Sequence, residues 1–318
     1  KLSEPAGGAR CCESRMRSAF SSLLTIRAVA LMSSTPVKRR RTAAAPNATP
    51  TKKRATTSPH FSGPAKGSFG PLLSATVAPH TLLLGTQPSD NSLREGKYFM
   101  TNANAFWHIV GDALGFRRGF HIDGRAEAVD FIRPHLLHDE AVDYDEAVAR
   151  LTGAGYALWD AVAASNRKGS LDGAIRDATY ADVRGLLAAT PSIRRICFST
   201  GAGSAKIFRK GNGAWLAEPG AFRCRDDAVS RGVFPKLPVD GDGVELCVME
   251  SVSPASNPRQ TWSKAKQAAF DDEYAARPAA IYPYKRKHWF EVCFRDELAV
   301  QKAPPFGSAP TDFRPEED

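Results

Sequence analysis

Residues 82–89 read LLLGTQPS, and the type of fold can be worked out from this stretch outward. Three leucines in a row predict a buried strand, and Gly85 predicts that the strand ends in a turn. A helix should follow, because the apolar residues of 105–114 recur at helical spacing and Gly115 stands where a helix C-cap is expected. The chain therefore enters its folded part as a strand, a polar loop and a helix.

The same alternation continues along the rest of the chain. Apolar runs at 156–162, 193–199 and 244–249 predict further buried strands, and segments 143–152 and 259–274 predict amphipathic helices. Strands separated by helices favour right-handed crossovers and a mainly parallel sheet with helices on both faces. We therefore expect an α/β fold, a three-layer α/β/α sandwich around a mainly parallel central sheet.

The candidate site can be located from this fold before any residue is assigned a role. In parallel α/β sheets a ligand lies beyond the carboxyl ends of the strands. The loops that follow the four expected strands cover residues 85–104, 160–172, 200–204 and 250–259, and we expect the chemistry of the protein there.

The basic charge of the chain is confined to its N-terminal part. The 318 residues carry a formal net charge of +9. Residues 1–75 hold 13 Lys and Arg against two acidic residues, whereas the remaining residues hold 30 basic and 32 acidic ones. Net charge alone therefore does not predict that the folded part binds nucleic acid.

Composition divides the chain into three segments. Residues 1–75 are rich in Ala, Ser, Thr, Pro and Arg and show no sustained period, so we expect a disordered basic tail there. We expect one folded domain over residues 76–300, followed by a flexible C-terminal tail over residues 301–318.

The N-terminal tail contains two candidate targeting signals. Basic clusters at 38–41 and 52–54 are separated by ten residues, which suits a bipartite nuclear localisation signal. The alternative is a solvated tail that binds anions without specificity. Residues 16–31 combine Arg, Ser and apolar residues without an acid, a composition that is typical of a mitochondrial transit peptide. We expect a nuclear protein, with a mitochondrial form as the alternative if translation begins upstream.

Several classes of protein are disfavoured by what the sequence lacks. No apolar stretch approaches the roughly 20 residues of a membrane span, so no membrane partner is expected. The six cysteines form no Cys-x-x-Cys pair, which argues against a zinc ribbon or an iron–sulfur cluster and for a reducing compartment. His135 and His138 have metal-like spacing, but no third ligand is evident. The Gly-x-Ser-x-Gly motif of esterases is absent.

The loop after the first strand combines aromatic and carboxamide side chains. It contains Tyr98 and Phe99 together with Asn102 and Asn104. Such side chains can stack on a planar base and hydrogen-bond its edge. A glycine and a proline earlier in the loop fix a rigid turn, which can bring backbone N–H groups close to a flat ligand. Asn104 could equally cap the helix that follows it.

These residues resemble the first motif of the uracil-DNA glycosylase superfamily, and in particular its hypoxanthine-DNA glycosylase-like branch. The similarity is carried by Gly-Thr-Gln-Pro-Ser at 85–89, Tyr-Phe at 98–99 and Asn-x-Phe-Trp at 104–107. Later stretches that agree, in the same order, are LWD at 158–160, RKGSLD at 167–172, ICFSTG at 196–201 and MESVSPA at 249–255. The resemblance covers roughly residues 78–276 and implies the sandwich fold expected above.

The resemblance implies a monofunctional DNA glycosylase of base excision repair. Such an enzyme flips a deaminated base, hypoxanthine or mismatched uracil, out of double-stranded DNA and hydrolyses its N-glycosidic bond. Asn104 would carry the principal catalytic role with Gln87 as the alternate, and Phe99 would stack on the extruded base. The other residues implied to bind substrate are Gly85, Pro88, Ser89, Ser251, Ser253 and Pro254. The residues implied to contact DNA are Arg167, Lys168, Ser170, Asn257 and Arg259. No metal or cofactor is implied, and we expect a monomer.

The sequence departs from this branch at several positions. Gln87 stands where the branch has an apolar residue, and Thr101-Asn102 replaces a His-Pro. Glu250 replaces a proline of the second motif, and residues 209–243 are expected to be a loop insertion. These departures put the preferred base and the rate in question, whereas the expected fold is unaffected.

Two other functions therefore stay open. A glycosylase-like protein could bind damaged or mismatched DNA without cleaving it, and an assay for abasic sites would separate the two. A hydrolase of free nucleosides or nucleotides would need no loop that grips DNA, so undamaged duplex would not compete with its substrate.

Overall fold

The computed structural model describes residues 65–122, 132–257, 263–265, 267, 268, 270 and 281–298. The predicted tail up to residue 64, with both basic clusters and residues 16–31, lies outside the described residues. Arg259, most of the helix expected at 259–274, and the C-terminal tail at 301–318 also lie outside them. What the sequence predicts for these segments stays a prediction.

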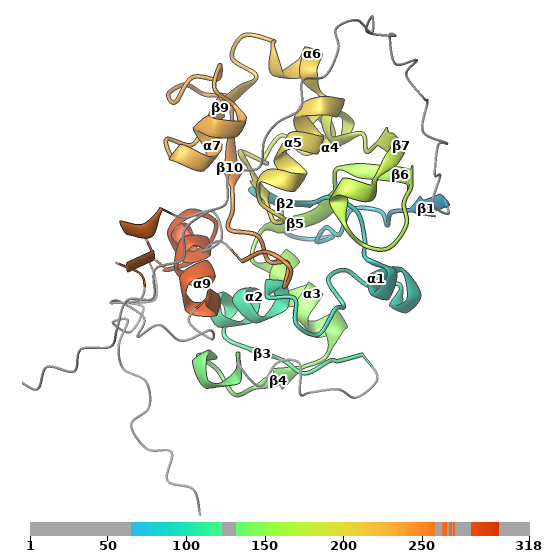
Figure 1. Cartoon of the computed structure of the whole chain (residues 1–318), viewed down its shortest axis with the longest axis vertical. Coiled ribbons are helices and arrows are strands. Elements are labelled where there is room, and N and C mark those ends of the chain that lie inside the picture. The colour runs from blue at the N-terminus through green and yellow to red at the C-terminus, as the bar shows by residue number, and fades with distance from the viewer. Residues whose placement is uncertain are drawn as a thin grey trace, which may run out of the picture. The chain divides into compact units, whose positions relative to one another are not determined.

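The central sheet has five strands, and every pair of neighbouring strands is parallel (Figure 1). The strand order is β5-β2-β8-β10-β9. Because β2 has a neighbour on each edge and helices over each face, all of its residues are buried, which explains its unbroken apolar run. The strands are β2 (Thr81–Gly85), β5 (Tyr156–Asp160), β8 (Arg195–Phe198), β9 (Phe222–Cys224) and β10 (Val244–Val248). The four strands predicted from the sequence are confirmed.

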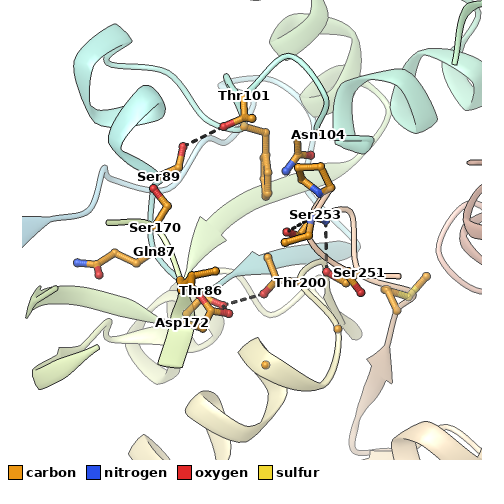
Figure 2. Close-up of a pocket in the computed structure, with 18 of the residues that line it drawn as sticks. Thr86, Gln87, Ser89, Thr101, Asn104, Ser170, Asp172, Thr200, Ser251 and Ser253 are labelled. Atoms are coloured by element: carbon orange, nitrogen blue, oxygen red, sulfur yellow. Dashed lines mark hydrogen bonds between the residues drawn. The ribbon is translucent and has the colours of Figure 1, made fainter. Parts of the chain in front are cut away.

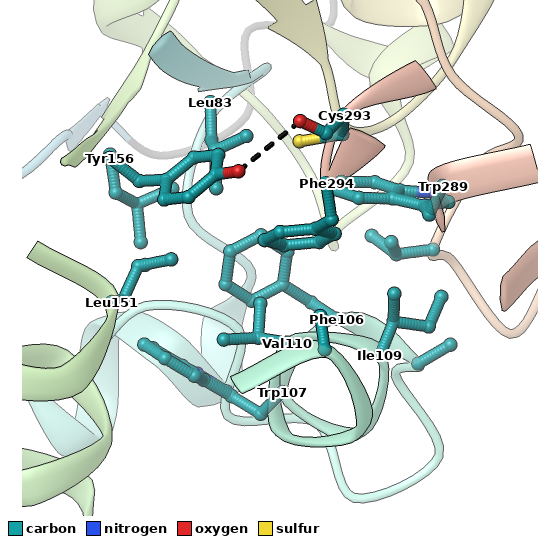
Figure 3. Close-up of a cluster of buried hydrophobic side chains, with 14 of the residues drawn as sticks. Leu83, Phe106, Trp107, Ile109, Val110, Leu151, Tyr156, Trp289, Cys293 and Phe294 are labelled. Atoms are coloured by element: carbon teal, nitrogen blue, oxygen red, sulfur yellow. Dashed lines mark hydrogen bonds between the residues drawn. The ribbon is translucent and has the colours of Figure 1, made fainter. Parts of the chain in front are cut away.

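Alternate residues of β2 supply two hydrophobic cores, one on each face of the sheet. Leu83 belongs to one core, which contains the ring systems in Figure 3, and Leu82 and Leu84 belong to the other. Helices that contribute to the Leu83 core are α2 (Phe106–Leu114), α3 (Tyr144–Gly153) and α9 (Ile281–Val292). Helices that contribute to the opposite core are α4 (Val183–Ala189), α5 (Ala202–Gly211) and α7 (Ala228–Val233). Helices on both faces confirm the three-layer α/β/α sandwich.

The folded part begins earlier than expected. Strand β1 (Ala65–Gly67) pairs antiparallel with β6 (Val162–Asn166), which in turn pairs with β7 (Arg176–Tyr180). The predicted end of the tail at residue 75 is therefore too late. The strand was missed because it has only three residues, none of which is large and apolar.

The segment 209–243 is not the loop insertion that was expected. It contains α6 (Gly213–Leu216), the edge strand β9 and α7. Phe222 and Cys224 of β9 are buried, so this segment completes the sheet and part of the core. A three-residue edge strand is too short to show a periodic pattern, which is the reason the sequence did not predict it.

Short elements complete the described structure. They are α1 (Asp90–Glu95), β3 (Arg117–Arg118), β4 (Ala141–Val142), α10 (Arg295–Leu298) and 3-10 turns at Arg133–His135 and Asp172–Ala174. Across the described ranges, no helix combines the length and the apolar character needed to cross a membrane.

Candidate active site

A cavity of about 750 Å³ lies beyond the carboxyl ends of β2, β5, β8 and β10 (Figure 2). Residues from all four loops in which the chemistry was expected line it. Its volume falls within the range of roughly 300–1,000 Å³ that is typical of small-molecule sites. The predicted site residues that line it are Gln87, Pro88, Ser89, Phe99, Asn104, Ser170, Ser251, Ser253, Pro254 and Asn257.

Gly85 lies at the end of β2, directly behind this lining. A Cβ atom at this position would overlap Oδ1 of Asp160 and would lie 3.6 Å from Cζ of Phe99. A glycine is therefore required here so that the backbone can approach these two side chains closely. Its role is to make room for the lining residues.

Phe99 is held in a strained backbone conformation beside the cavity. Its φ angle of 55° lies in the left-handed region, which costs a non-glycine residue about 1–3 kcal/mol. Neighbouring contacts hold it there, because the indole N–H of Trp107 donates to the Tyr98 carbonyl at 2.8 Å and the Tyr98 N–H donates to the Tyr144 hydroxyl. The ring stacks on Phe106 with centroids 4.1 Å apart, so only its other face is available to a planar ligand.

Asn104 uses the two ends of its carboxamide differently. Its Oδ1 accepts a hydrogen bond from the backbone N–H of Phe106, the first residue of α2, at 2.9 Å, although the N-cap of that helix is Ala105. Its amide nitrogen makes no hydrogen bond to the described residues and is turned toward the cavity in Figure 2. The group that Asn104 offers to a ligand is therefore an N–H donor.

The carboxamide of Gln87 is committed to the protein itself. Its nitrogen donates to the carbonyl of Lys66 in β1 at 2.9 Å, and its oxygen accepts from the Ser165 hydroxyl in β6 at 2.7 Å. Gln87 is 7% exposed and its amide points away from the centre of the cavity (Figure 2). These bonds join β1 and β6 to the first loop and hold the amide in an orientation that faces away from the centre of the cavity (Figure 2).

The loop after β6 was predicted to contact DNA through three residues, and the side chain of one of them is buried. Arg167 is fully buried and donates to the carbonyl of Pro88, so the prediction that it contacts DNA is wrong. Burial lowers the pKa of its guanidinium, which the charges of Asp172, Asp90 and Asp160 oppose. Its side chain supports the first loop from inside.

Lys168 and Ser170 keep the positions expected of residues that contact DNA. Both are exposed. The Ser170 hydroxyl accepts from the backbone N–H of Asp90 at 3.0 Å, and Ser170 also lines the cavity. Their predicted role in binding DNA stays a prediction.

Helix α9, which the sequence did not predict, holds the loop that follows β10. The buried ammonium of Lys285 donates to the carbonyls of Ser253 and Ser256 at 3.1 and 2.9 Å. Burial lowers the pKa of Lys285 to about 8. The indole N–H of Trp289 donates to the Glu250 carbonyl at 2.8 Å, and the Tyr284 hydroxyl donates to the Glu250 carboxylate at 3.1 Å. The residue that replaces a proline of the motif is thus an anchor for α9.

Two carboxylates that the sequence analysis did not assign to the site also line the cavity. Asp160 ends β5 and is 2% exposed, and Asp172 follows it in the next loop. The Thr86 hydroxyl lies 2.9 Å from Asp172 Oδ2 and 2.7 Å from the Thr200 hydroxyl (Figure 2). Burial raises the pKa of both carboxyl groups, that of Asp160 to about 7. The available signal was an Asp within the otherwise apolar run at 156–162, beside a predicted loop.

The histidines with metal-like spacing have other partners. The carbonyl of His135 accepts from Arg286, and the Nε2 atom of His138 lies 3.3 Å from the carbonyl of Asp112. Within the described ranges, no group of three or more His, Cys, Asp or Glu residues could hold a metal ion.

A parallel α/β/α sandwich with an aromatic ring and a carboxamide beyond its first strand is the class of structure that the resemblance to uracil-DNA glycosylases implied. A curated relative agrees with it: the chain is 33% identical over 118 residues to hypoxanthine DNA glycosylase of Methanosarcina acetivorans. The alignment covers 37% of this chain and 61% of the relative's length. The chain is thus similar to this hypoxanthine DNA glycosylase, and it spans less than two thirds of that relative's length.

The chain was also compared with family models and with solved structures. No family model matches the chain. A solution NMR structure from Methanosarcina acetivorans, provisionally assigned as a uracil DNA glycosylase, covers 70% of this chain and 99% of its own, with 24% identity and a TM-score of 0.38.

Proposed function

We propose that the chain is a monofunctional DNA glycosylase, a hydrolase that flips a deaminated base out of double-stranded DNA and cleaves its N-glycosidic bond. The observation that carries this proposal is one cavity lined by both the Phe99 ring and the Asn104 amide. A base stacked on an aromatic ring gains about 1–3 kcal/mol. The backbone of Phe99 has a strained φ angle, and strained residues of this kind are often found at functional sites.

The free N–H of Asn104 supports a preference for deaminated bases. Adenine and cytosine carry an amino group at the position where hypoxanthine and uracil carry a carbonyl oxygen. A fixed donor hydrogen-bonds the carbonyl and is left unpaired against the amino group, which disfavours the undamaged base. We therefore propose hypoxanthine and mismatched uracil as the substrates.

The loop after β10 is suited to hold the DNA strand beside the cavity. Residues 251–257 are small and mostly polar, and Pro254, Ala255 and Asn257 in it are exposed. Hydroxyl and backbone N–H groups of such a loop can bind a phosphate. The loop can thus keep the extruded nucleotide in place while the base occupies the cavity.

The test is an assay for abasic sites on duplexes that carry one hypoxanthine or one uracil, each opposite every normal base. We expect alkali-labile sites to accumulate at the damaged position and not in the matched undamaged duplex. Undamaged duplex in excess should slow the reaction, because the enzyme binds DNA. Binding to the damaged duplexes without any cleavage would contradict the proposal.

A protein that binds damaged DNA without cleaving it is the second candidate, and one observation favours it. The carboxamide oxygens of Gln87 and Asn104 both accept hydrogen bonds from the protein, at 2.7 and 2.9 Å. Each oxygen is therefore shared with the protein and keeps only one lone pair for an attacking water. The same abasic-site assay separates this candidate from the enzyme.

Lys285→Met should weaken the binding of damaged duplex by roughly tenfold, or about 1.4 kcal/mol. The change keeps the apolar stem of the side chain but removes the two hydrogen bonds that hold the Ser253 and Ser256 carbonyls. Fluorescence anisotropy with a labelled duplex measures the effect. Lys287→Met removes the same charge from the same helix and is the control; equal losses in both variants would mean that charge alone is responsible.

A further inference from the structure

Asp160 lies where the end of β5 meets the end of β2, beside the ring on which the base is proposed to stack. Its Oδ1 occupies the space that Gly85 leaves by having no Cβ, and the tip of the Phe99 ring borders the same space. Asp160 is among the residues that line the cavity, although it is only 2% exposed. A base stacked on Phe99 would therefore have one edge close to this carboxyl group.

The two oxygens of the Asp160 carboxyl group are in different situations. Oδ2 accepts a hydrogen bond from the Ser68 hydroxyl at 2.8 Å. Oδ1 has no hydrogen-bond partner among the described residues. While the Ser68 hydroxyl donates to Oδ2, the proton of a neutral Asp160 lies on Oδ1. The neutral group thus has its O–H donor beside Gly85 and the tip of the Phe99 ring, and Asp160 is one of the residues that line the cavity.

We propose that Asp160 is a catalytic residue that protonates the departing base. The inference rests on the proposed glycosylase function and adds to it the group that activates the leaving base. The ligand class it implies is a nucleobase with an acceptor nitrogen at the edge that faces Asp160, as a purine such as hypoxanthine has.

The reaction is a hydrolysis in which Asp160 donates one proton and later regains one. The proton moves from Asp160 Oδ1 to the acceptor nitrogen of the purine, and the electron pair of the bond between C1′ and N9 goes to the base. The oxygen of a water molecule forms the new bond to C1′. One proton of that water is released, which restores the neutral Asp160, so no metal, oxidant or reductant takes part.

The surroundings of Asp160 favour its neutral form at and below about pH 7, to a degree that falls as the pH rises. Burial raises its pKa to about 7, and the charge of Asp172 acts in the same direction. The Ser68 hydrogen bond and the charge of Arg167 lower it. Tyr98 also faces Asp160, but burial raises the pKa of its phenol far above the usual value, so it stays neutral. The carboxyl group is therefore poised to act near pH 7.

The test is the pH profile of single-turnover excision from a hypoxanthine duplex by the full chain. An acid acts only while it is protonated, so the rate of the wild type should be level below pH 7 and fall above it. Asp160→Asn cannot supply a proton, and we expect a loss of about 10²-fold at pH 6 together with the disappearance of this fall. If the decrease in rate above pH 7 is caused by the substrate or by another residue, it will also be seen in Asp160→Asn. That result would overturn the proposal.

Two further variants keep the test decisive if Asp160→Asn folds poorly. Ser68→Ala removes a bond that stabilises the charged form, so the fall should move to higher pH. Asp172→Asn removes a charge that disfavours the charged form, so the fall should move to lower pH. Unmoved profiles in both variants, or a wild-type rate that rises through pH 7, would overturn the assignment of Asp160 as the acid. If the wild type forms no abasic sites at any pH, the proposed function itself fails and this inference fails with it.

Discussion

Asn104→Ala should lower single-turnover excision by roughly 10²–10³-fold while the affinity for damaged duplex stays close to that of the wild type. The amide nitrogen of Asn104 is the free donor in the cavity, and a donor that strengthens as charge develops on the departing base acts mainly on the rate. Rapid-quench measurement of abasic sites gives the rate, and anisotropy gives the affinity.

Asn104→Asp is the matched control for the structural role of this side chain. Its Oδ1 can still accept from the Phe106 N–H, so helix α2 keeps its hydrogen bond, whereas the amide donor is lost. We expect this variant to be as slow as Asn104→Ala, without the loss of about 1 kcal/mol of stability that the alanine variant should show. Gln87→Ala should cost less than about tenfold in rate, because its amide bonds β1 and β6 instead of facing the cavity. An active, folded Asn104→Asp beside an inactive Gln87→Ala would reverse the assignment.

Asp112→Ala should lower the free energy of unfolding by about 3–5 kcal/mol. Asp112 is 3% exposed and accepts hydrogen bonds from Arg286 at 2.5 Å, from the Tyr282 hydroxyl at 2.8 Å and from the Leu137 N–H at 2.8 Å. Its removal leaves the charge of Arg286, which is 8% exposed, without compensation. Urea unfolding followed by tryptophan fluorescence measures the loss.

A double variant separates the ion pair from the packing around it. Asp112→Ala combined with Arg286→Met replaces both charges, so part of the lost stability should return. If the two residues are not coupled, the loss in free energy of unfolding of the double variant will equal the sum of the losses of Asp112→Ala and Arg286→Met. The pair joins α2 to α9, so it also supports the two elements that position Asn104 and the loop after β10.

The order of elements could be predicted from the sequence because the burial of a strand or helix depends on the apolar residues within that segment. Each long central strand is a run of apolar residues followed by a polar loop, and Leu83 alternates with Leu82 and Leu84 between two cores. The strands that were missed, β1 and β9, have three residues each. Their pairing partners, and not their own composition, make them strands, so no local pattern could reveal them.

The location of the site could be predicted for a related reason. Parallel strands bring their carboxyl ends to one edge of the sheet, so any loops that follow them converge there. Ten of the predicted residues line the cavity, as expected if the loops that contain them converge at this edge of the sheet. The orientation of individual side chains could not be predicted in this way, as Arg167 illustrates: a basic residue in a polar loop turned out to be fully buried beneath Pro88.

The layers of the sandwich, the loops that form the cavity and the resemblance to DNA glycosylases could all be read from the residues themselves. Only the tertiary structure decided which atoms face that cavity. Gln87 is bound by residues 21 and 78 positions away, so it faces inward, while Asn104 is bound by a neighbour through one atom and keeps its N–H free. Asp160 joins the site because Gly85, in a different strand, leaves room for its carboxyl group. The physical reason is that the direction and charge of a buried polar group depend on partners distant in the chain, whereas the tendency of a segment to be buried depends on its own residues.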